Sequence, residues 1–128
     1  MIKINHMENK ATILEKSLLV LWNERDASKR LEIMKEIYTE DITFFESNER
    51  EAIIGYEDIN KVIAGLQLQW PLSFRFELNR PSAKNHNVQH ISWNLGNAGE
   101  KPVASGMDVA IMEGNKIKSL HLMLDNPE

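Results

Sequence analysis

The C-terminal third of the chain alternates as β-strands do, but it carries apolar side chains on both faces. In 103–111 the odd positions are bulky and apolar except Ser105, whereas the even positions are small apart from one carboxylate, Asp108. In 116–124 both faces again hold large apolar groups, and one of them is a row of leucines: Leu120, Leu122 and Leu124. A sheet with one solvated face would alternate apolar with polar residues. We therefore expect both faces of this sheet to be covered.

Three stretches before the sheet have the periodicity of helices, with apolar residues three and four positions apart. The first is 8–25. The second begins near Ser28, which could cap it, and has Tyr38 on its buried side. The third is 56–70, and Pro71 ends it. Strands are predicted at 42–46, 73–79, 88–95, 102–112 and 116–124. Helices followed by a run of antiparallel strands are typical of an α+β fold.

Length, charge and the absence of cysteine exclude several classes of protein. With 128 residues we expect one domain over 1–128, of which 1–7 is a flexible tail without the features of a signal peptide. The net charge of -4 shows no basic face for nucleic acid or for an anionic membrane. The longest apolar run, 18–22, is far shorter than the ~20 residues of a membrane span. Without cysteine there is neither a disulfide nor a thiolate site, and we expect a cytoplasmic protein.

His86 and His90 have the H-x-x-x-H spacing that places two metal ligands on one face of a helix. Here the spacing leads into a predicted strand, and no third ligand lies nearby. We therefore expect no metal site, and we expect His90 on the face of its strand opposite Trp93. His121 is expected on the same side of its strand as Met123.

Two carboxylates are the candidates for chemistry. Asp108 lies in mid-strand, where aspartate is depleted, and small residues on its face leave space beside it. It lines a pocket, or it is a structural carboxylate that binds a backbone amide or a buried tryptophan N–H. Glu46 shares a strand face with Ile42 and Phe44, which suits a general base with a raised pKa. Alternatively, it is a strand-end residue turned to solvent, since the residues after it are polar.

The aromatic residues are first of all core residues. They are Trp22, Tyr38, Tyr56, Trp70 and Trp93. Of these, Trp22 and Tyr38 could each also offer a hydrogen-bond donor to a pocket.

Five short segments carry a likeness to a known superfamily: WNERD at 22–26, YTEDI at 38–42, IGYE at 54–57, GMDV at 106–109 and EGNKI at 113–117. Their order and spacing, over about residues 10–126, resemble the nuclear transport factor 2-like superfamily. Its SnoaL-like and ketosteroid-isomerase-like branches are the most similar. The resemblance implies a cone, in which a strongly curved, mostly antiparallel sheet wraps three helices around an apolar pocket. The same fold hosts isomerases, dehydratases, cyclases and plain binding proteins.

The resemblance also implies roles for particular residues. Glu46 falls where ketosteroid isomerases keep their general base, and Asp108 where they keep the protonated acid of the oxyanion hole. The tyrosine of the first helix that donates to the oxyanion is replaced by Leu18 or Leu21, and Leu124 stands in place of a pocket aromatic. The residues expected to line the pocket are Leu18, Leu21, Trp22, Tyr38, Phe44, Trp93, Leu120 and Leu124.

Three functions are compatible with these residues. The first is a SnoaL-like enzyme that needs no cofactor and transfers a proton on a small apolar carbonyl compound, by isomerisation, cyclisation or dehydration. The second is a non-catalytic carrier of a small hydrophobic ligand, and the third is a protein-interaction module.

We also expect a homodimer packed through the outer face of the sheet. That face presents a row of large apolar side chains: Met107, Val109, Ile111, Ile117 and Met123. Exposed together, they would form an unusually large apolar patch for a monomer.

Overall fold

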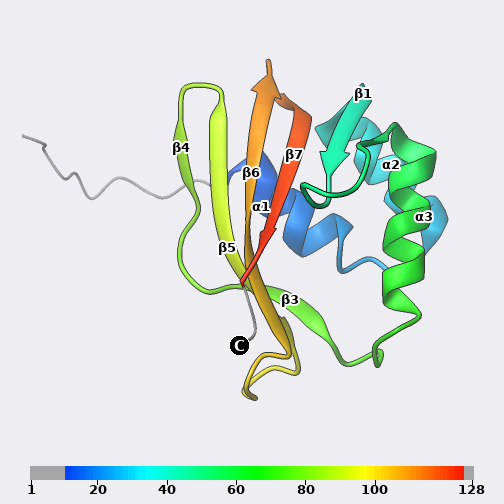
Figure 1. The fold of residues 1–128 in the computed structure, drawn as a ribbon, viewed down its shortest axis with the longest axis vertical. Coiled ribbons are helices and arrows are strands. Elements are labelled where there is room, and N and C mark those ends of the chain that lie inside the picture. The colour runs from blue at the N-terminus through cyan, green and yellow to red at the C-terminus, as the bar shows by residue number, and fades with distance from the viewer. Residues whose placement is uncertain (1–10, 126–128) are drawn as a thin grey trace, which may run out of the picture.

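The computed structural model describes residues 11–125 (Figure 1). The first helix consists of α1 (Ile13–Lys16) and a π-helical continuation, η1 (Ser17–Leu21), and it is followed by α2 (Ala27–Ile37) and α3 (Tyr56–Gln67). The strands are β1 (Tyr38–Phe45), β2 (Ile53–Ile54), β3 (Arg75–Leu78), β4 (Ala83–Asn85), β5 (Val88–Gly96), β6 (Ala104–Glu113) and β7 (Lys116–Leu124). Within the described residues every helix precedes β3, as the periodicity predicts.

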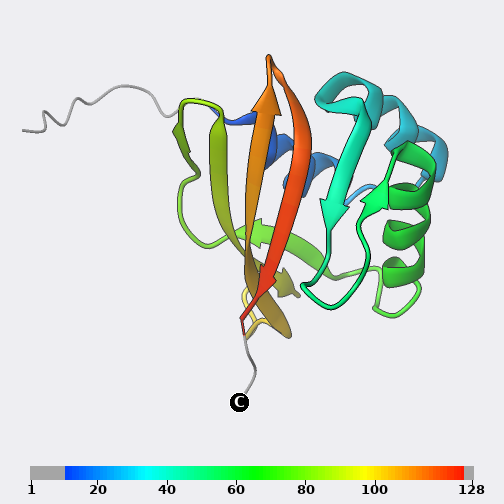
Figure 2. The ribbon, with the colours of Figure 1, turned by 45° about the horizontal axis from the view of Figure 1, so that its top comes forward.

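The strands form one curved sheet in the order β2-β1-β7-β6-β5-β3, and β4 pairs beside β5. Every pairing is antiparallel except that of β1 with β7, which is parallel. Figures 1 and 2 show the helices gathered on one side of this sheet, with α1 crossing behind β6 and β7. The α+β cone expected from the sequence is confirmed.

The first helix ends earlier than its apolar periodicity predicts, at Leu21 and not at residue 25. Asn23 explains the end, because its Nδ2 donates to the Leu19 carbonyl and to the Phe76 carbonyl, both at 3.1 Å. Its Oδ1 accepts from the Phe76 N–H at 2.8 Å. Asn23 therefore caps the helix and binds it to β3. The predicted start, at residues 8–10, lies outside the described residues.

The second and third helices also depart from prediction at their ends. The N-cap of α2 is Asp26 and not Ser28, because the Asp26 carboxylate accepts from the N–H groups of Ser28 and Lys29. Tyr38 is the first residue of β1 and not part of the helix. The third helix stops at Gln67, three residues before Trp70.

The predicted strands all exist, β7 with the predicted ends and the others with altered ends, and two short strands were not predicted. β1 is longer than 42–46 at its start, and Glu46 follows it directly. β3 is shorter than 73–79, while β6 begins two residues after Pro102. The unpredicted strands are β2, of two residues, and β4, of three, which are too short to show an alternating pattern.

The inner face of the sheet and the apolar sides of the helices form the core. Ile117 belongs to this core with no exposed surface, so its expected place on the outer face is wrong. The register of β6 against β7 shifts between Ile111 and Met112, and this irregularity moves Ile117 onto the same face as Leu120. A bulge of this kind breaks the period of two on which the prediction rested.

Among residues 11–125, no helix combines the length and the apolar character that crossing a lipid bilayer requires.

The outer face of β6 and β7 remains apolar without Ile117. Met107, Val109 and Ile111 are half-buried there, and Met123 is exposed by 49%. Next to them the Phe45 ring stacks on His121, with centroids 4.6 Å apart.

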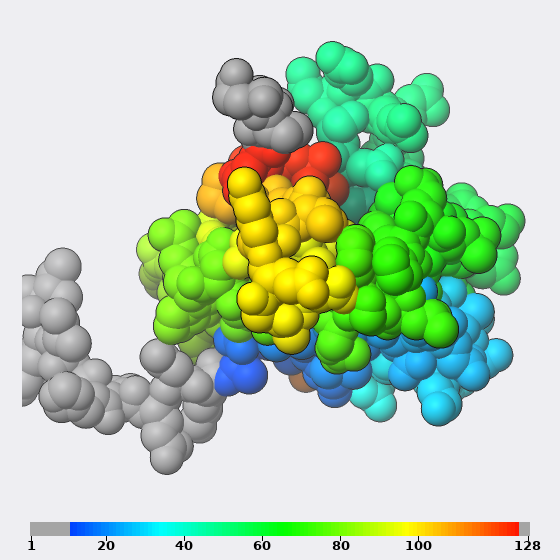
Figure 3. All heavy atoms as spheres, turned by 90° about the horizontal axis from the view of Figure 1, so that it is seen from below, coloured from blue at the N-terminus to red at the C-terminus, as the bar shows by residue number. Residues whose placement is uncertain are grey.

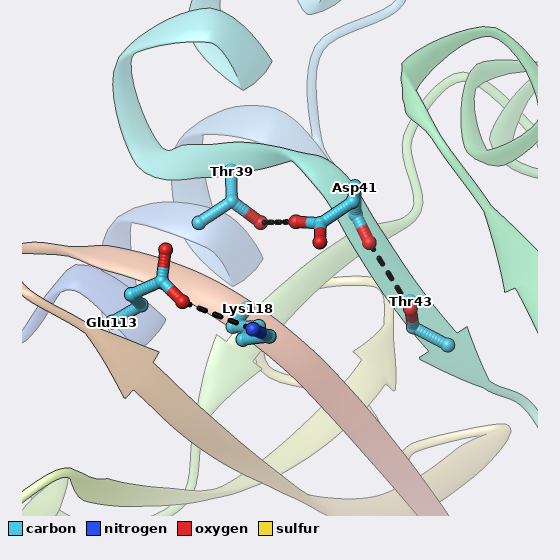
Figure 4. Close-up of polar contacts among 5 residues, drawn as sticks. All are labelled: Thr39, Asp41, Thr43, Glu113 and Lys118. Atoms are coloured by element: carbon cyan, nitrogen blue, oxygen red, sulfur yellow. Dashed lines mark hydrogen bonds and ion pairs between the residues drawn. The ribbon is translucent and has the colours of Figure 1, made fainter.

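A group of polar side chains, here called the polar border, lies on β1 and next to the turn between β6 and β7 (Figure 4). There Thr39 donates to the Asp41 carboxylate at 2.8 Å, and Lys118 pairs with Glu113 at 3.0 Å. A second copy laid on the apolar part by a two-fold axis would cover it self-complementarily.

A homodimer therefore remains our prediction. Sedimentation at micromolar concentration is expected to give about twice the chain mass of 14.8 kDa. Met107→Lys, which places a charge in the apolar row, is expected to shift the population to monomer, whereas Lys118→Ala in the polar border is the matched control. A wild-type chain that sediments as a monomer contradicts the prediction.

Candidate functional site

A cavity of about 340 Å³ lies between the sheet and the helices. Its lining is Leu18, Trp22, Phe44, Glu46, Ser47, Arg50, Leu66, Trp70, Phe76, Trp93, Leu95, Ala104, Asp108, Leu120, Leu122 and Leu124. Figure 3 views the end of the molecule where the contributing segments meet, namely the segment after β1 in teal, the end of α3 in green, residues 96–104 in yellow and the end of β7 in red. Most of the lining is aromatic or aliphatic.

An aromatic cluster forms one wall of the cavity. Phe76 on β3 stands at its centre and makes edge-to-face contacts with three tryptophans: Trp22 at 6.2 Å, Trp70 at 6.0 Å and Trp93 at 5.2 Å between ring centroids. Trp22 also packs against Phe44 at 5.5 Å. These rings come from the end of the first helix, the turn after α3 and three strands, so only the fold brings them together.

Asp108 lies on the sheet wall of this cavity, on β6 between Ile91 of β5 and Leu122 of β7. The indole N–H of Trp93 donates to its Oδ1 at 3.0 Å. The structural role considered for this aspartate, a carboxylate that accepts from a buried tryptophan N–H, is therefore observed. The same side chain also faces the cavity, so the two readings hold together.

Burial raises the pKa of the Asp108 carboxyl to about 7, and the hydrogen bond from Trp93 partly opposes that rise. The cause is the apolar surroundings, which disfavour the charged form. The charge of Glu46, which lines the same cavity, is not among the causes of this shift. At neutral pH both the acid and the carboxylate form of Asp108 are therefore populated.

Gly106 allows Trp93 to reach Asp108. A Cβ at position 106 would lie 2.8 Å from Cζ2 of Trp93 and 2.8 Å from the Met123 carbonyl oxygen. The space beside Asp108 that the small residues of β6 predict is therefore filled by the Trp93 ring at position 106. At Ala104 the small side chain faces the cavity instead.

Gly106→Ala is expected to destabilise the fold by about 1–3 kcal/mol, because the added methyl overpacks Trp93. Urea denaturation measures this loss, and a changed tryptophan emission spectrum would report the displaced ring. Gly65→Ala in α3 is the matched control, since nothing lies within 4 Å of a Cβ at that position. That control is expected to be neutral or to stabilise by about 0.4–1 kcal/mol. Equal effects of the two substitutions would contradict the packing argument.

Glu46 follows β1 and lines the same cavity as Asp108. Its side chain is 24% exposed, and its Oε1 lies 3.6 Å from Nη1 of Arg50, which is 75% exposed. Glu46 is therefore neither fully solvated nor unpaired. Arg50 and Ser47 join it in a polar group at one end of the lining.

Tyr38 and Leu21 do not line the cavity, contrary to expectation. Both are fully buried in the core. The Tyr38 hydroxyl lies 2.6 Å from Oγ of Ser17 and accepts from the Trp22 indole N–H at 3.3 Å. Burial, with a smaller contribution from the Asp108 charge, raises the pKa of Tyr38 to about 12, while the hydrogen bonds with Ser17 and Trp22 oppose that rise. Neither Trp22 nor Tyr38 therefore offers a spare donor to the cavity.

The remaining expected residues lie along the cavity as follows: Leu18, Trp22, Phe44, Trp93, Leu120 and Leu124. Ala104 lines the cavity on the face that it shares with Asp108, as the alternation predicts, but seven other lining residues were not predicted: Ser47, Arg50, Leu66, Trp70, Phe76, Leu95 and Leu122. Leu122 shares the alternating face of Leu120 and Leu124, so the period of two was a usable signal. Arg50 lies in a turn, where no periodicity shows the direction of a side chain. Trp70 lies three residues beyond the end of α3, so the helical periodicity that predicted it in the core does not apply to it.

The three histidines within the described residues, His86, His90 and His121, do not assemble a metal site. His86 lies in the turn between β4 and β5, with a φ of 52°, while His90 lies on β5 with its Nε2 3.3 Å from the Met107 sulfur. Over residues 11–125 no three side chains of the histidine and acidic types come close enough together to hold a metal ion.

Comparison with known proteins shows the fold. No protein-family model matches the chain, and a search of curated proteins finds no match. Among solved structures, a candidate isomerase of the SnoaL-like family from Agrobacterium tumefaciens matches with a TM-score of 0.77 and 23% identity, over 89% of this chain and 95% of that one. A candidate SnoaL-like polyketide cyclase from Jannaschia matches with a TM-score of 0.70 and 11% identity, over 88% and 83%.

A candidate ketosteroid isomerase from Kribbella flavida is also similar, with a TM-score of 0.67 and 14% identity, over 91% of this chain and 77% of that one. At such identities the likeness shows the fold and not the reaction. The chain therefore has the cone fold of SnoaL-like and ketosteroid-isomerase-like proteins.

Proposed function

We propose that the protein transfers a proton on a small apolar carbonyl compound without a cofactor, in a reaction of the isomerase, cyclase or dehydratase type. The observation that carries this proposal is Asp108, a carboxyl group on the wall of a largely apolar cavity whose pKa is raised to about 7. A group that titrates near the working pH is suited to exchange or share a proton with a substrate. Glu46 lines the same cavity and supplies a second carboxylate.

In this proposal the two carboxylates have different tasks. Asp108 in its protonated form donates a hydrogen bond to the carbonyl oxygen, where negative charge develops as the substrate loses a proton. The Trp93 indole N–H donates to Oδ1 of Asp108, so the other carboxyl oxygen is left to carry the proton. Glu46 acts as the base that removes the proton beside the carbonyl. Arg50 keeps Glu46 in place through their 3.6 Å contact.

The cavity supplies less oxyanion stabilisation than a site with a tyrosine donor in the first helix. Leu18 lines the cavity from that helix, and the Trp22 N–H is already bound to the Tyr38 hydroxyl. Asp108 is then the principal donor to the carbonyl oxygen. The proposal therefore favours substrates whose enol form is already accessible, such as those with two activating groups.

Glu46→Gln is expected to lower the rate of proton transfer by about 10²–10⁴-fold, because glutamine keeps the shape of glutamate but is no base. The measurement is the exchange of α-protons of small apolar ketones and 1,3-dicarbonyl compounds for deuterium, followed by NMR. Asp108→Asn is expected to retain part of the activity, since the amide N–H₂ still donates. Glu113→Gln, an exposed carboxylate outside the cavity, is the matched control.

A non-catalytic ligand-binding protein is the alternative function. The contact between Glu46 and the Arg50 guanidinium favours it, because this ion pair already engages Oε1 of the proposed base. If the wild-type protein binds these compounds, but exchanges their protons no faster than Glu46→Gln does, the alternative is the better description. The open cavity supports either function over a module that binds only other proteins.

A further inference from the structure

The charges that line the cavity do not balance when Asp108 is ionised. Among the lining residues only Glu46, Arg50 and Asp108 are charged or titratable in the neutral range. Arg50 pairs with Glu46, so it offers no counter-charge to Asp108. Ile91 and Leu122 flank Asp108 on the neighbouring strands, Trp93 donates to it, and its charge acts on Tyr38; none of these residues is a cation. A buried carboxylate without a cationic partner is costly.

One oxygen of Asp108 remains available to a ligand. Oδ1 accepts from Trp93, while within residues 11–125 no donor binds the other oxygen. Asp108 is half-buried, and it is among the residues that line the cavity. A cation that enters the cavity can therefore approach this oxygen without displacing a protein hydrogen bond.

The aromatic wall provides the second half of such a site. Phe76 and the three tryptophans around it lie in the same cavity as Asp108, and Trp93 touches both. The N–H groups of Trp22 and Trp93 are already used by Tyr38 and Asp108. These rings therefore offer a ligand hydrocarbon and π surface, which attracts organic cations.

We infer that the cavity binds a small organic ammonium ion, with ionised Asp108 as its counter-charge and the aromatic cluster around its alkyl groups. This ligand class is distinct from the carbonyl compounds proposed above and does not depend on catalysis. The two classes use opposite states of Asp108, because a carbonyl oxygen needs the protonated acid and an ammonium ion needs the carboxylate. Their binding therefore has opposite pH dependence.

The test compares choline with 3,3-dimethylbutan-1-ol, which has the same shape but no charge. Choline keeps its charge at every pH, so any pH dependence belongs to the protein. With a carboxyl pKa of about 7, choline is expected to bind about tenfold more tightly at pH 8 than at pH 6, measured by calorimetry or tryptophan fluorescence. The neutral alcohol is expected to bind equally or more weakly at pH 8.

Asp108→Asn is expected to remove the pH dependence of choline binding and to weaken it at pH 8 by about tenfold. Asp41→Asn, which removes one negative charge from the outer face of β1, is the matched control and is expected to bind as wild type does. The wild-type comparison of the two ligands stands even if Asp108→Asn does not fold. Absent choline binding, choline affinity independent of pH, or equal affinities for choline and the alcohol at pH 8 would overturn the inference. None of these outcomes bears on deuterium exchange of ketones, which tests the catalytic proposal separately.

Discussion

The Asp108→Asn variant is expected to be more stable than the wild-type protein at pH 8, although it removes a group proposed to be functional. The folded state holds the Asp108 proton up to a pKa of about 7, whereas the unfolded chain releases it near 3.8. Between these values the folded state binds more protons, so wild-type stability falls as pH rises from about 4 to 7. Asparagine does not ionise, and its Oδ1 still accepts from Trp93. It therefore avoids this loss.

The expected size of this effect is large for a protein of this length. A pKa displaced from 3.8 to about 7 corresponds to on the order of 4 kcal/mol, against a total stability of ~5–15 kcal/mol. The measurement is the difference in unfolding free energy between wild type and Asp108→Asn, by urea denaturation from pH 4 to pH 8. The difference is expected to be near zero at pH 4 and to grow toward pH 7. Asp41→Asn on the exposed outer face is the control. A difference that does not change with pH would mean that Asp108 is not held in a desolvated site.

Arg30→Met is expected to destabilise the fold by about 3 kcal/mol or more, because it leaves several buried acceptors without a donor. Arg30 on α2 is only 1% exposed. Its Nε donates to Asn60 Oδ1 at 2.5 Å, and its Nη1 donates to the Glu24 carbonyl at 2.8 Å and to Gln67 Oε1 at 2.9 Å. Methionine fills a similar length but donates nothing, so the contact between α2, α3 and the 22–26 loop loses its polar core.

Urea denaturation measures this loss as a lower midpoint at an unchanged slope. Lys29→Met, at the neighbouring exposed position of α2, is the control and is expected to change stability by no more than about 0.5 kcal/mol. Arg30→Lys is not expected to rescue the fold, since one ammonium group cannot reproduce the planar fork of guanidinium donors. An Arg30→Met variant within 1 kcal/mol of wild type would show that the three acceptors find water or other donors.

The sequence predicts the long strands of the sheet better than its short strands and irregularities, because the prediction depends on the alternation of apolar and other residues along a strand. The alternation in 102–124 places β6 and β7 and points Ala104, Asp108 and Leu120 inward. It fails at Ile117, where one shift of register reverses the faces. It also fails for β2 and β4, which contain too few residues to alternate. The helices are found from their apolar spacing, but their ends depend on side chains such as Asn23 and Asp26.

The candidate site is predictable where a residue is unusual for its own strand. Asp108 stands out as a carboxylate among small residues in a strand, so it could be singled out without a structure. Arg30, Arg50 and Trp70 show no such contrast. A charged residue in a helix or turn is exposed by default, and a tryptophan in a helical stripe is expected in the core. The buried place of Arg30 and the packing of Trp70 on Phe76 result from contacts between elements far apart in the chain, whereas Arg50 reaches the cavity from an exposed turn beside Glu46.

The parallel pairing of β1 with β7 has a consequence for the order in which the chain can fold. Thr43 pairs with Ser119, 76 positions later, and Phe44 pairs with Leu120. During synthesis β1 therefore emerges long before β7, the strand that will pair with it. Until β7 is made, the inner residues of β1 can pack only against β2 and the helices. Closing so long a loop is entropically slow, so this pairing is expected to be a late step of folding. A ribosome-bound chain that stops before β7 would present β1 as an unpaired edge, which makes such intermediates natural clients of chaperones.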